Sequence, residues 1–152
     1  MKKYLVIAVL AVFGALFAVP GVASAHHVTL TADVSCLEDD GSWSVTWTAN
    51  NSESNKTMDI TDTDLVGDSN TSGGFDQNPA DPTFSPDPVP FSGNATAVTE
   101  HGSGTARVRL SVTGDWTQAS ENTDTETVNK PTQLCNPHVH GTASLDADVS
   151  CV

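Results

Sequence analysis

The 152-residue sequence predicts an all-β protein, an antiparallel β-sandwich of about seven strands. Apolar and polar residues alternate along most of the chain, and no stretch has the spacing of an amphipathic helix. The alternating segments are rich in Thr and Val, and turns rich in Gly, Asn, Asp and Ser separate them. Alternation with a period of two gives each strand one buried and one solvated face, which is typical of antiparallel sheets.

The longest alternating segments predict strands at residues 28–34, 42–50 and 105–114. Their inward positions are Val28, Leu30, Ala32 and Val34, then Trp43, Val45 and Trp47, then Val108, Leu110 and Val112. Shorter strands are predicted at residues 56–61, 95–100, 123–129 and 142–150. Seven short strands separated by such turns are typical of an immunoglobulin-like β-sandwich.

The first 25 residues have the pattern of a secretory signal peptide. Lys2 and Lys3 precede an apolar run over residues 4–19, and small residues at 23–25 supply a cleavage site. The run is too short for a comfortable membrane span, and no other stretch is apolar enough for one. We therefore expect a mature chain that begins at His26 and is secreted, either extracellular or at the cell surface.

Acidic residues dominate the rest of the composition. The formal net charge is −13, from 19 Asp and Glu against six Lys and Arg, of which Lys2 and Lys3 belong to the signal. A charge of this sign argues against nucleic acids and anionic membrane surfaces as partners. It suits an extracellular protein with a solvated acidic surface.

The chain contains a near repeat. Residues 30–36 read LTADVSC and residues 145–151 read LDADVSC, an offset of 145 − 30 = 115 positions. This offset is close to the length of one sandwich domain and predicts a tandem array. Residues 26–137 would then form one module, and residues 138–152 the first strand of an incomplete second repeat. The alternative is a single domain whose last strand lies within residues 138–152.

Three cysteines follow the signal, so at least one lies outside an intramolecular pair. Cys36 ends the first strand and Cys135 lies near the end of the module, and we expect these two to form a disulfide. Such a bridge stabilises by on the order of 4–5 kcal/mol through loop closure. Cys151 is then unpaired and could join two chains, as could the C-terminal strand by pairing with a neighbouring sheet. In the alternative, Cys151 bonds to Cys36.

A long interruption separates the predicted strands between residues 68 and 93. It holds most of the prolines and almost no aliphatic residues, and it is too long for an ordinary connection. It is therefore either a functional loop or a disordered one. Phe75, Phe84 and Phe91 would either pin it across the sandwich, which we favour, or form an exposed aromatic surface.

Two stretches carry a resemblance to a known kind of protein. HVTLTADVSC at residues 27–36 and GSWSVTWTANNSES at residues 41–54, after a signal that ends in Ala, resemble secreted surface proteins of Gram-positive bacteria, actinobacteria especially. Such proteins carry repeated immunoglobulin-like modules. The resemblance implies surface display or adhesion, with a surface protein or a glycan as ligand, and it implies no catalytic residue.

Copper binding is a second hypothesis from the residues themselves. Cleavage before His26 would offer its α-amine and imidazole to one metal ion, and imidazole nitrogen suits Cu(II). The second imidazole would come from His27, His138 or His140, with His101 also available. The HVH stretch places His138 and His140 on one face if it is extended.

Calcium is a third hypothesis. The stretch DITDTDLVGDSN brings Asp59, Asp62, Asp64 and Asp68 close together in sequence, and carboxylate oxygens suit calcium. The spacing does not fit an EF-hand, so we expect at most an irregular site in an acidic loop. Ordinary turn chemistry explains the same residues without a metal.

Nucleophilic catalysis finds little support in the sequence. The stretch HGSGT at residues 101–105 is not a nucleophile elbow, because His and Ser stand beside each other on a turn. Trp43, Trp47 and Trp116 would form a sugar platform only if exposed, and alternation with Val45 predicts that the first two are buried. The sequence therefore predicts a secreted, non-catalytic structural or adhesive module, with extracellular copper binding through His26 as the alternative.

Overall fold

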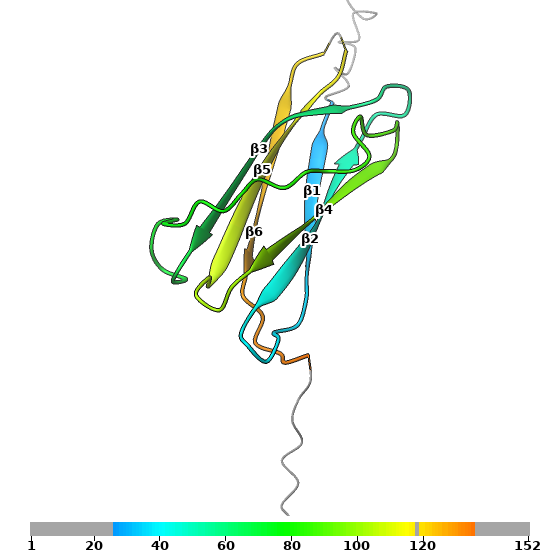
Figure 1. Ribbon diagram of the computed structural model, residues 1–152. Helices are drawn as coiled ribbons and strands as arrows, with labels where there is room; N and C mark the ends of the chain where they lie inside the picture. Colours follow the sequence, from blue (N-terminus) through cyan, green and yellow to red (C-terminus); the bar gives the residue numbers. More distant parts are fainter. Residues whose placement is uncertain (1–25, 118, 136–152) are drawn as a thin grey trace, which may run out of the picture.

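The computed structural model describes residues 26–117 and 119–135. In these two ranges the chain forms six strands and no helix, arranged as two sheets (Figure 1). The strands are β1 (Val28–Val34), β2 (Trp43–Asn51), β3 (Asp59–Asp68), β4 (Asn94–His101), β5 (Arg107–Asp115) and β6 (Asn122–Asn129).

The sheets have the strand orders β1-β2-β4 and β3-β5-β6, and all neighbouring strands are antiparallel. This is the order of an immunoglobulin constant-type sandwich with its fourth strand missing, because an irregular segment joins β3 to β4. The predicted fold class is confirmed. The predicted seventh strand at residues 142–150 lies outside the described residues.

One predicted strand has the wrong bounds. We expected a strand at residues 56–61 followed by an acidic loop, but β3 begins at Asp59 and continues to Asp68. Asp has a low β-propensity, which made this stretch look like a turn. Its alternate side chains are solvated while its backbone pairs with β5, and a register shift at Thr61 accommodates one extra residue.

The core lies between the sheets and contains the predicted inward positions of β2 and β5. Trp43, Trp47 and Trp116 are almost completely buried, so they form core and not a sugar platform. Each indole N–H donates a hydrogen bond: to Thr105 O at 3.2 Å, Thr99 Oγ1 at 2.9 Å and Asn51 Oδ1 at 2.8 Å, respectively. Partners for all three donors make this burial favourable.

Side chains join the two sheets along one side of the sandwich. The backbone N–H of Val28 in β1 donates to Asn122 Oδ1 at 3.2 Å, and that of Leu30 donates to Asp124 Oδ2 at 2.8 Å. Both acceptors lie on β6, the edge strand of the other sheet. The β1 edge therefore has acceptors from its own chain, which blocks pairing with a foreign strand.

The irregular segment, residues 69–93, runs along the free edge of β3 and then crosses to β4 (Figure 1). Gly67 exchanges two backbone hydrogen bonds of 2.9 Å with Gln77, and Ser85 exchanges two of 2.9 Å with Thr96 of β4. Phe84 is buried and pins the segment, as expected. Phe91 is 61% exposed, so our expectation that it would also pin the segment is wrong.

Candidate functional site

A disulfide joins Cys36 and Cys135, whose Cα atoms lie 4.9 Å apart. The adjoining backbone supports it, because Leu37 N donates to Gln133 O at 2.8 Å and Cys135 N donates to Leu37 O at 2.9 Å. The predicted pairing is confirmed, and the alternative bond from Cys36 to Cys151 is not the one formed. Cys151 itself lies outside the described residues.

The disulfide lies at one end of the sandwich. We call this end, with Cys36 and Cys135, the C-terminal pole, and the opposite end, with His26, the N-terminal pole (Figure 1). The described chain therefore enters at one pole and leaves at the other. Strand β1 runs from pole to pole, and the bridge connects its far end directly to the exit of the chain.

At the N-terminal pole, His26 is held by two contacts. Its Nδ1 lies 2.7 Å from Glu53 Oε1, and its ring stacks on Trp116 with a centroid distance of 5.6 Å. Glu53 is itself positioned by Asn51, whose Oδ1 accepts from the Glu53 backbone N–H at 3.0 Å. The histidine nearest the predicted cleavage site is thus packed against the sandwich.

The described part of the predicted copper site consists of His26 and the exposed His27, because His138 and His140 lie outside the described residues. Nδ1 is the ring nitrogen that would close a six-membered chelate with the α-amine, and in this structure it faces Glu53. Among residues 26–117 and 119–135, no three His, Cys, Asp or Glu side chains meet in a group that could hold a metal ion.

The four aspartates of the calcium hypothesis lie along strand β3. Our expectation of an acidic loop at this place is therefore wrong. Asp68 is completely buried, and its Oδ2 accepts from Arg107 Nη2 at 2.7 Å and Nε at 2.9 Å. The remaining three, Asp59, Asp62 and Asp64, are exposed and face Asp115, Thr113 and Ser111 of β5 in the register. Asp68 is therefore the buried acidic member of an ion pair with Arg107.

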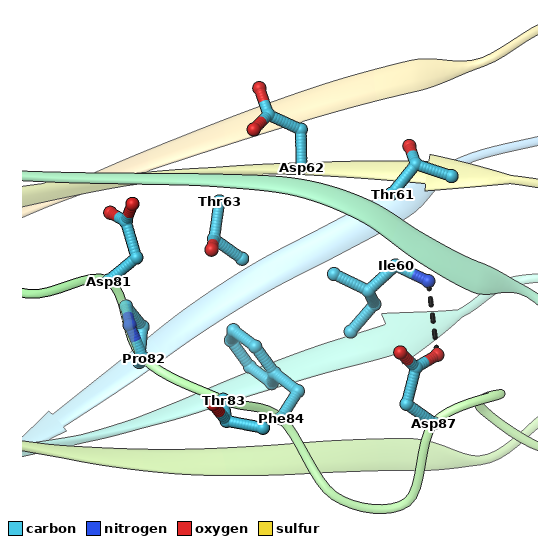
Figure 2. A pocket seen from close by; sticks show the side chains of 9 residues that line it. All are labelled: Ile60, Thr61, Asp62, Thr63, Asp81, Pro82, Thr83, Phe84 and Asp87. Atoms are coloured by element: carbon cyan, nitrogen blue, oxygen red, sulfur yellow. Dashed lines mark hydrogen bonds between the residues drawn. The ribbon is translucent and has the colours of Figure 1, made fainter.

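A groove of about 300 Å³ lies between β3 and residues 81–87 (Figure 2). Two carboxylates fasten its sides: Asp81 Oδ1 accepts from Leu65 N at 2.7 Å, and Asp87 Oδ1 accepts from Ile60 N at 3.1 Å. Figure 2 shows Asp62 on the far side of the β3 ribbon, away from Phe84 and Asp87. These two hydrogen bonds hold the irregular segment against β3 along the groove.

A second groove, of about 460 Å³, lies at the N-terminal pole. Its lining residues are Asn55, Lys56, Thr57, Phe91 and Thr117. Lys56 Nζ donates to Thr117 O at 3.4 Å, a long hydrogen bond at an exposed position. The groove therefore combines an exposed aromatic ring with a positive charge.

His101 belongs to the core. Its Nε2 lies 2.8 Å from Thr99 Oγ1, which also accepts from the Trp47 indole, and its ring packs 4.8 Å from Trp43. Burial lowers the pKa of His101, because the charged imidazolium loses its hydration there. This histidine is a satisfied core residue, and its surroundings do not offer it to a metal or a substrate.

No protein-family model, curated protein or solved structure matches this sequence. No helix within residues 26–117 and 119–135 is long and apolar enough to cross a bilayer. The structural features from which a function can be inferred are strand β1, which runs from pole to pole, the disulfide at its end, and the two grooves.

Sequence reasoning missed the residues that build these features. Glu53, Lys56 and Thr117 belong to turns without any motif. Asp81 and Asp87 did carry a signal, because each precedes a proline. Proline restricts the residue before it to extended conformations, which favours a chain that lies alongside a strand edge.

Proposed function

We propose that this chain is a secreted immunoglobulin-like module that bears load in a cell-surface protein and presents its surfaces for adhesion, without catalysis. One observation carries the proposal: the path from the N-terminal pole through β1 to the Cys36–Cys135 bridge. A pull on the two ends of the module acts along this path. The remainder of the sandwich lies inside the covalent loop and carries no tension.

The path is nearly inextensible. Strand β1 is already extended, at about 3.3 Å per residue against a limit of about 3.6 Å. Stretching residues 26–36 to that limit would lengthen the module by only a few ångströms. Residues 37–134 cannot be drawn out while the bridge is intact, since it spans 99 residues of sequence. A module of this kind keeps its length when cells are pulled from a surface.

The supporting features fit an extracellular setting. Disulfides persist in oxidising compartments, and the first 25 residues have the pattern of a cleaved signal. The resemblance to surface proteins of Gram-positive bacteria implies the same location.

Single-molecule pulling on the exported chain, held by handles at its two ends, tests the proposal. With the disulfide intact, we expect no unfolding step longer than a few ångströms from the module. In reductant, or with Cys135→Ser, an extra ~98 residues should be released, a gain of roughly 350 Å in contour length. A long step in the oxidised protein would overturn the proposal, as would a short step in Cys135→Ser.

A further inference from the structure

We infer that residues 143–151 can fill the place of β1 in a second copy of this chain, with Cys151 bonded to Cys135 of that copy. The accepting copy then holds a donated strand where its own β1 lay. The inference goes beyond the proposed function, because it assigns the chain a partner and a covalent linkage to it.

The position of β1 in the fold permits such an exchange. β1 is the first strand of the described chain and an edge strand of its sheet, so it can be replaced without one segment threading past another. It pairs with β2 along its whole length, and side chains of β6 contact it from the other sheet. We call this place between β2 and β6 the β1 slot. Exchange of an identical element between copies is a low-cost route to assembly.

The repeat preserves the side chains that β1 turns inward. We call the residue 115 positions later (145 − 30) the counterpart of a β1 residue. The inward residues of β1 are Val28, Leu30, Ala32 and Val34, and their counterparts are Ala143, Leu145, Ala147 and Val149. Within the seven-residue repeat the single difference, Thr31 against Asp146, falls at an exposed position. A strand formed by the repeat would therefore bury an equivalent apolar face.

Polar contacts that hold β1 at its two ends are available to the repeat as well. The backbone N–H of Leu30 donates to Asp124 Oδ2 of β6 at 2.8 Å, and any residue other than proline supplies this donor. Ser35 N donates to Ser44 O at 2.9 Å, and Ser35 Oγ accepts from Ser44 N at 2.8 Å. The counterpart of Ser35 is Ser150, so the same side chain is present at that end.

The β1 slot ends beside Cys135. Cys36 follows β1 and bonds to Cys135, with the two Cα atoms 4.9 Å apart. Cys151 is the counterpart of Cys36, so a repeat strand in the same register brings its sulfur to the same place. The Cys151 thiolate then attacks Cys135 Sγ, the bond from Cys135 to Cys36 breaks, and Cys36 leaves as a thiolate that takes up a proton. The number of disulfides is unchanged, and no oxidant is consumed.

The repeat is too close to Cys135 in sequence to fill the slot of its own chain. Cys135 lies at the C-terminal pole, whereas the slot begins at the N-terminal pole. The eight steps from residue 135 to residue 143 span at most about 29 Å, and the slot from position 28 to position 36 takes up about 26 Å. The difference of about 3 Å is less than one residue, and a reversal of the chain needs at least two. The slot of another copy is free of this limit.

The chain's own β1 has two advantages over a donated strand. Val28 buries more apolar surface than its counterpart Ala143. The own strand is also tethered to the sandwich, which raises its effective concentration. A donated strand therefore competes when chains are concentrated and the bridge to Cys135 is free to rearrange, as in a redox buffer.

Oxidation of the reduced exported chain tests the inference. Isotope-labelled and unlabelled chains are mixed, oxidised in a glutathione redox buffer at rising chain concentration, and their disulfides are mapped by peptide mass. We expect oligomers in which Cys135 of one chain is bonded to Cys151 of another, with Cys36 of the accepting chain outside any protein disulfide. Oligomers joined through two Cys151 residues, with the bridge from Cys36 to Cys135 intact in every chain, overturn the inference. The absence of oligomers up to about 1 mM chain also overturns it.

Two adjacent substitutions separate strand insertion from random contact of two thiols. Leu145 is the counterpart of the buried Leu30, and Asp146 is the counterpart of the exposed Thr31. Leu145→Ser should lower the yield of the Cys135–Cys151 linkage about tenfold or more, whereas Asp146→Ser should leave it unchanged. Both variants keep residues 26–135 intact, so a lower yield would not reflect a defect in the sandwich. Equal yields from the two variants overturn the inference.

Hydrogen exchange in the isolated dimer identifies the strand that fills the slot. We expect β1 to lose protection in the accepting chain, residues 145–149 of the donor to gain it, and β2 to keep it in both chains. Protection retained by β1 in both chains overturns the inference, because the copies would then be linked without exchanging a strand.

Discussion

The two sides of the sandwich are closed by different means. On one side, β1 is held by its ladder with β2, by the Asn122 and Asp124 side chains and by the disulfide. On the other side, β3 is covered by the irregular segment, which hydrogen bonds and Phe84 hold in place. The difference indicates that the covalent bond was placed where the chain passes from pole to pole, and that reversible contacts suffice for the edge away from this path.

The largest expected effect comes from removing the bridge. Cys36→Ser combined with Cys135→Ser should lower the free energy of unfolding by about 4–5 kcal/mol, because the unfolded chain gains the freedom of a loop of about 100 residues. Chemical denaturation followed by Trp fluorescence measures this, with the reduced wild-type chain as control. A loss below about 1 kcal/mol would mean that the ladder with β2 and the Asn122 and Asp124 side chains hold the β1 side without help from the disulfide.

A smaller loss of stability is expected when either of two carboxylates is removed, each of which binds the edge strand of one sheet. Asp81 and Asp124 both accept from an edge-strand N–H, at 2.7 and 2.8 Å. Asp81→Ala should cost about 1 kcal/mol and speed hydrogen exchange locally at Leu65 and in residues 69–93. Asp124→Ala should cost a similar amount but leave exchange in that segment unchanged, and it should affect Leu30.

Equal acceleration of the irregular segment by both variants would contradict this division. It would mean that the two sides open together and that the contrast between covalent and reversible closure has no dynamic counterpart.

The smallest expected effect is a decline of folding stability at acidic pH. Burial lowers the pKa of His101 in the folded protein below its ordinary value of 6.5, so the unfolded chain binds a proton first as the pH falls. Stability should be fully present above about pH 6.5 and decline below it, through the lowered pKa. His101→Gln should flatten this decline in denaturation curves recorded between pH 7 and 5. An unchanged slope would show that His101 is not the group responsible.

Much of the fold was predictable because the alternation is strong. Val45, Leu110 and their neighbours repeat every second residue, and burial follows that period. The bounds of β3 were not predictable, because aspartates on a solvated face have the same composition as an acidic turn. The conformation of residues 69–93 depends on long-range contacts such as Leu65 with Asp81, for which local patterning gives no signal.

The candidate site was predictable in its covalent part alone. Cys36 and Cys135 could be paired because the repeat singled out Cys151 as the equivalent of Cys36. Glu53 and Lys56 could not be found, because their roles follow from the packing of several turns at one pole. That packing is set by the sandwich as a whole and by no single stretch of sequence.

The closed loop formed by the disulfide has a further consequence for the way the chain withstands proteolytic cleavage. Residues 37–134 lie within a covalent ring, since the bridge joins Cys36 to Cys135. A single cut anywhere in that ring opens it but releases no fragment, and the chain stays continuous from the N-terminal pole through the bridge to whatever follows. A chain with one cut in the ring would therefore stay in one covalent piece, and only cleavage outside the ring would sever it.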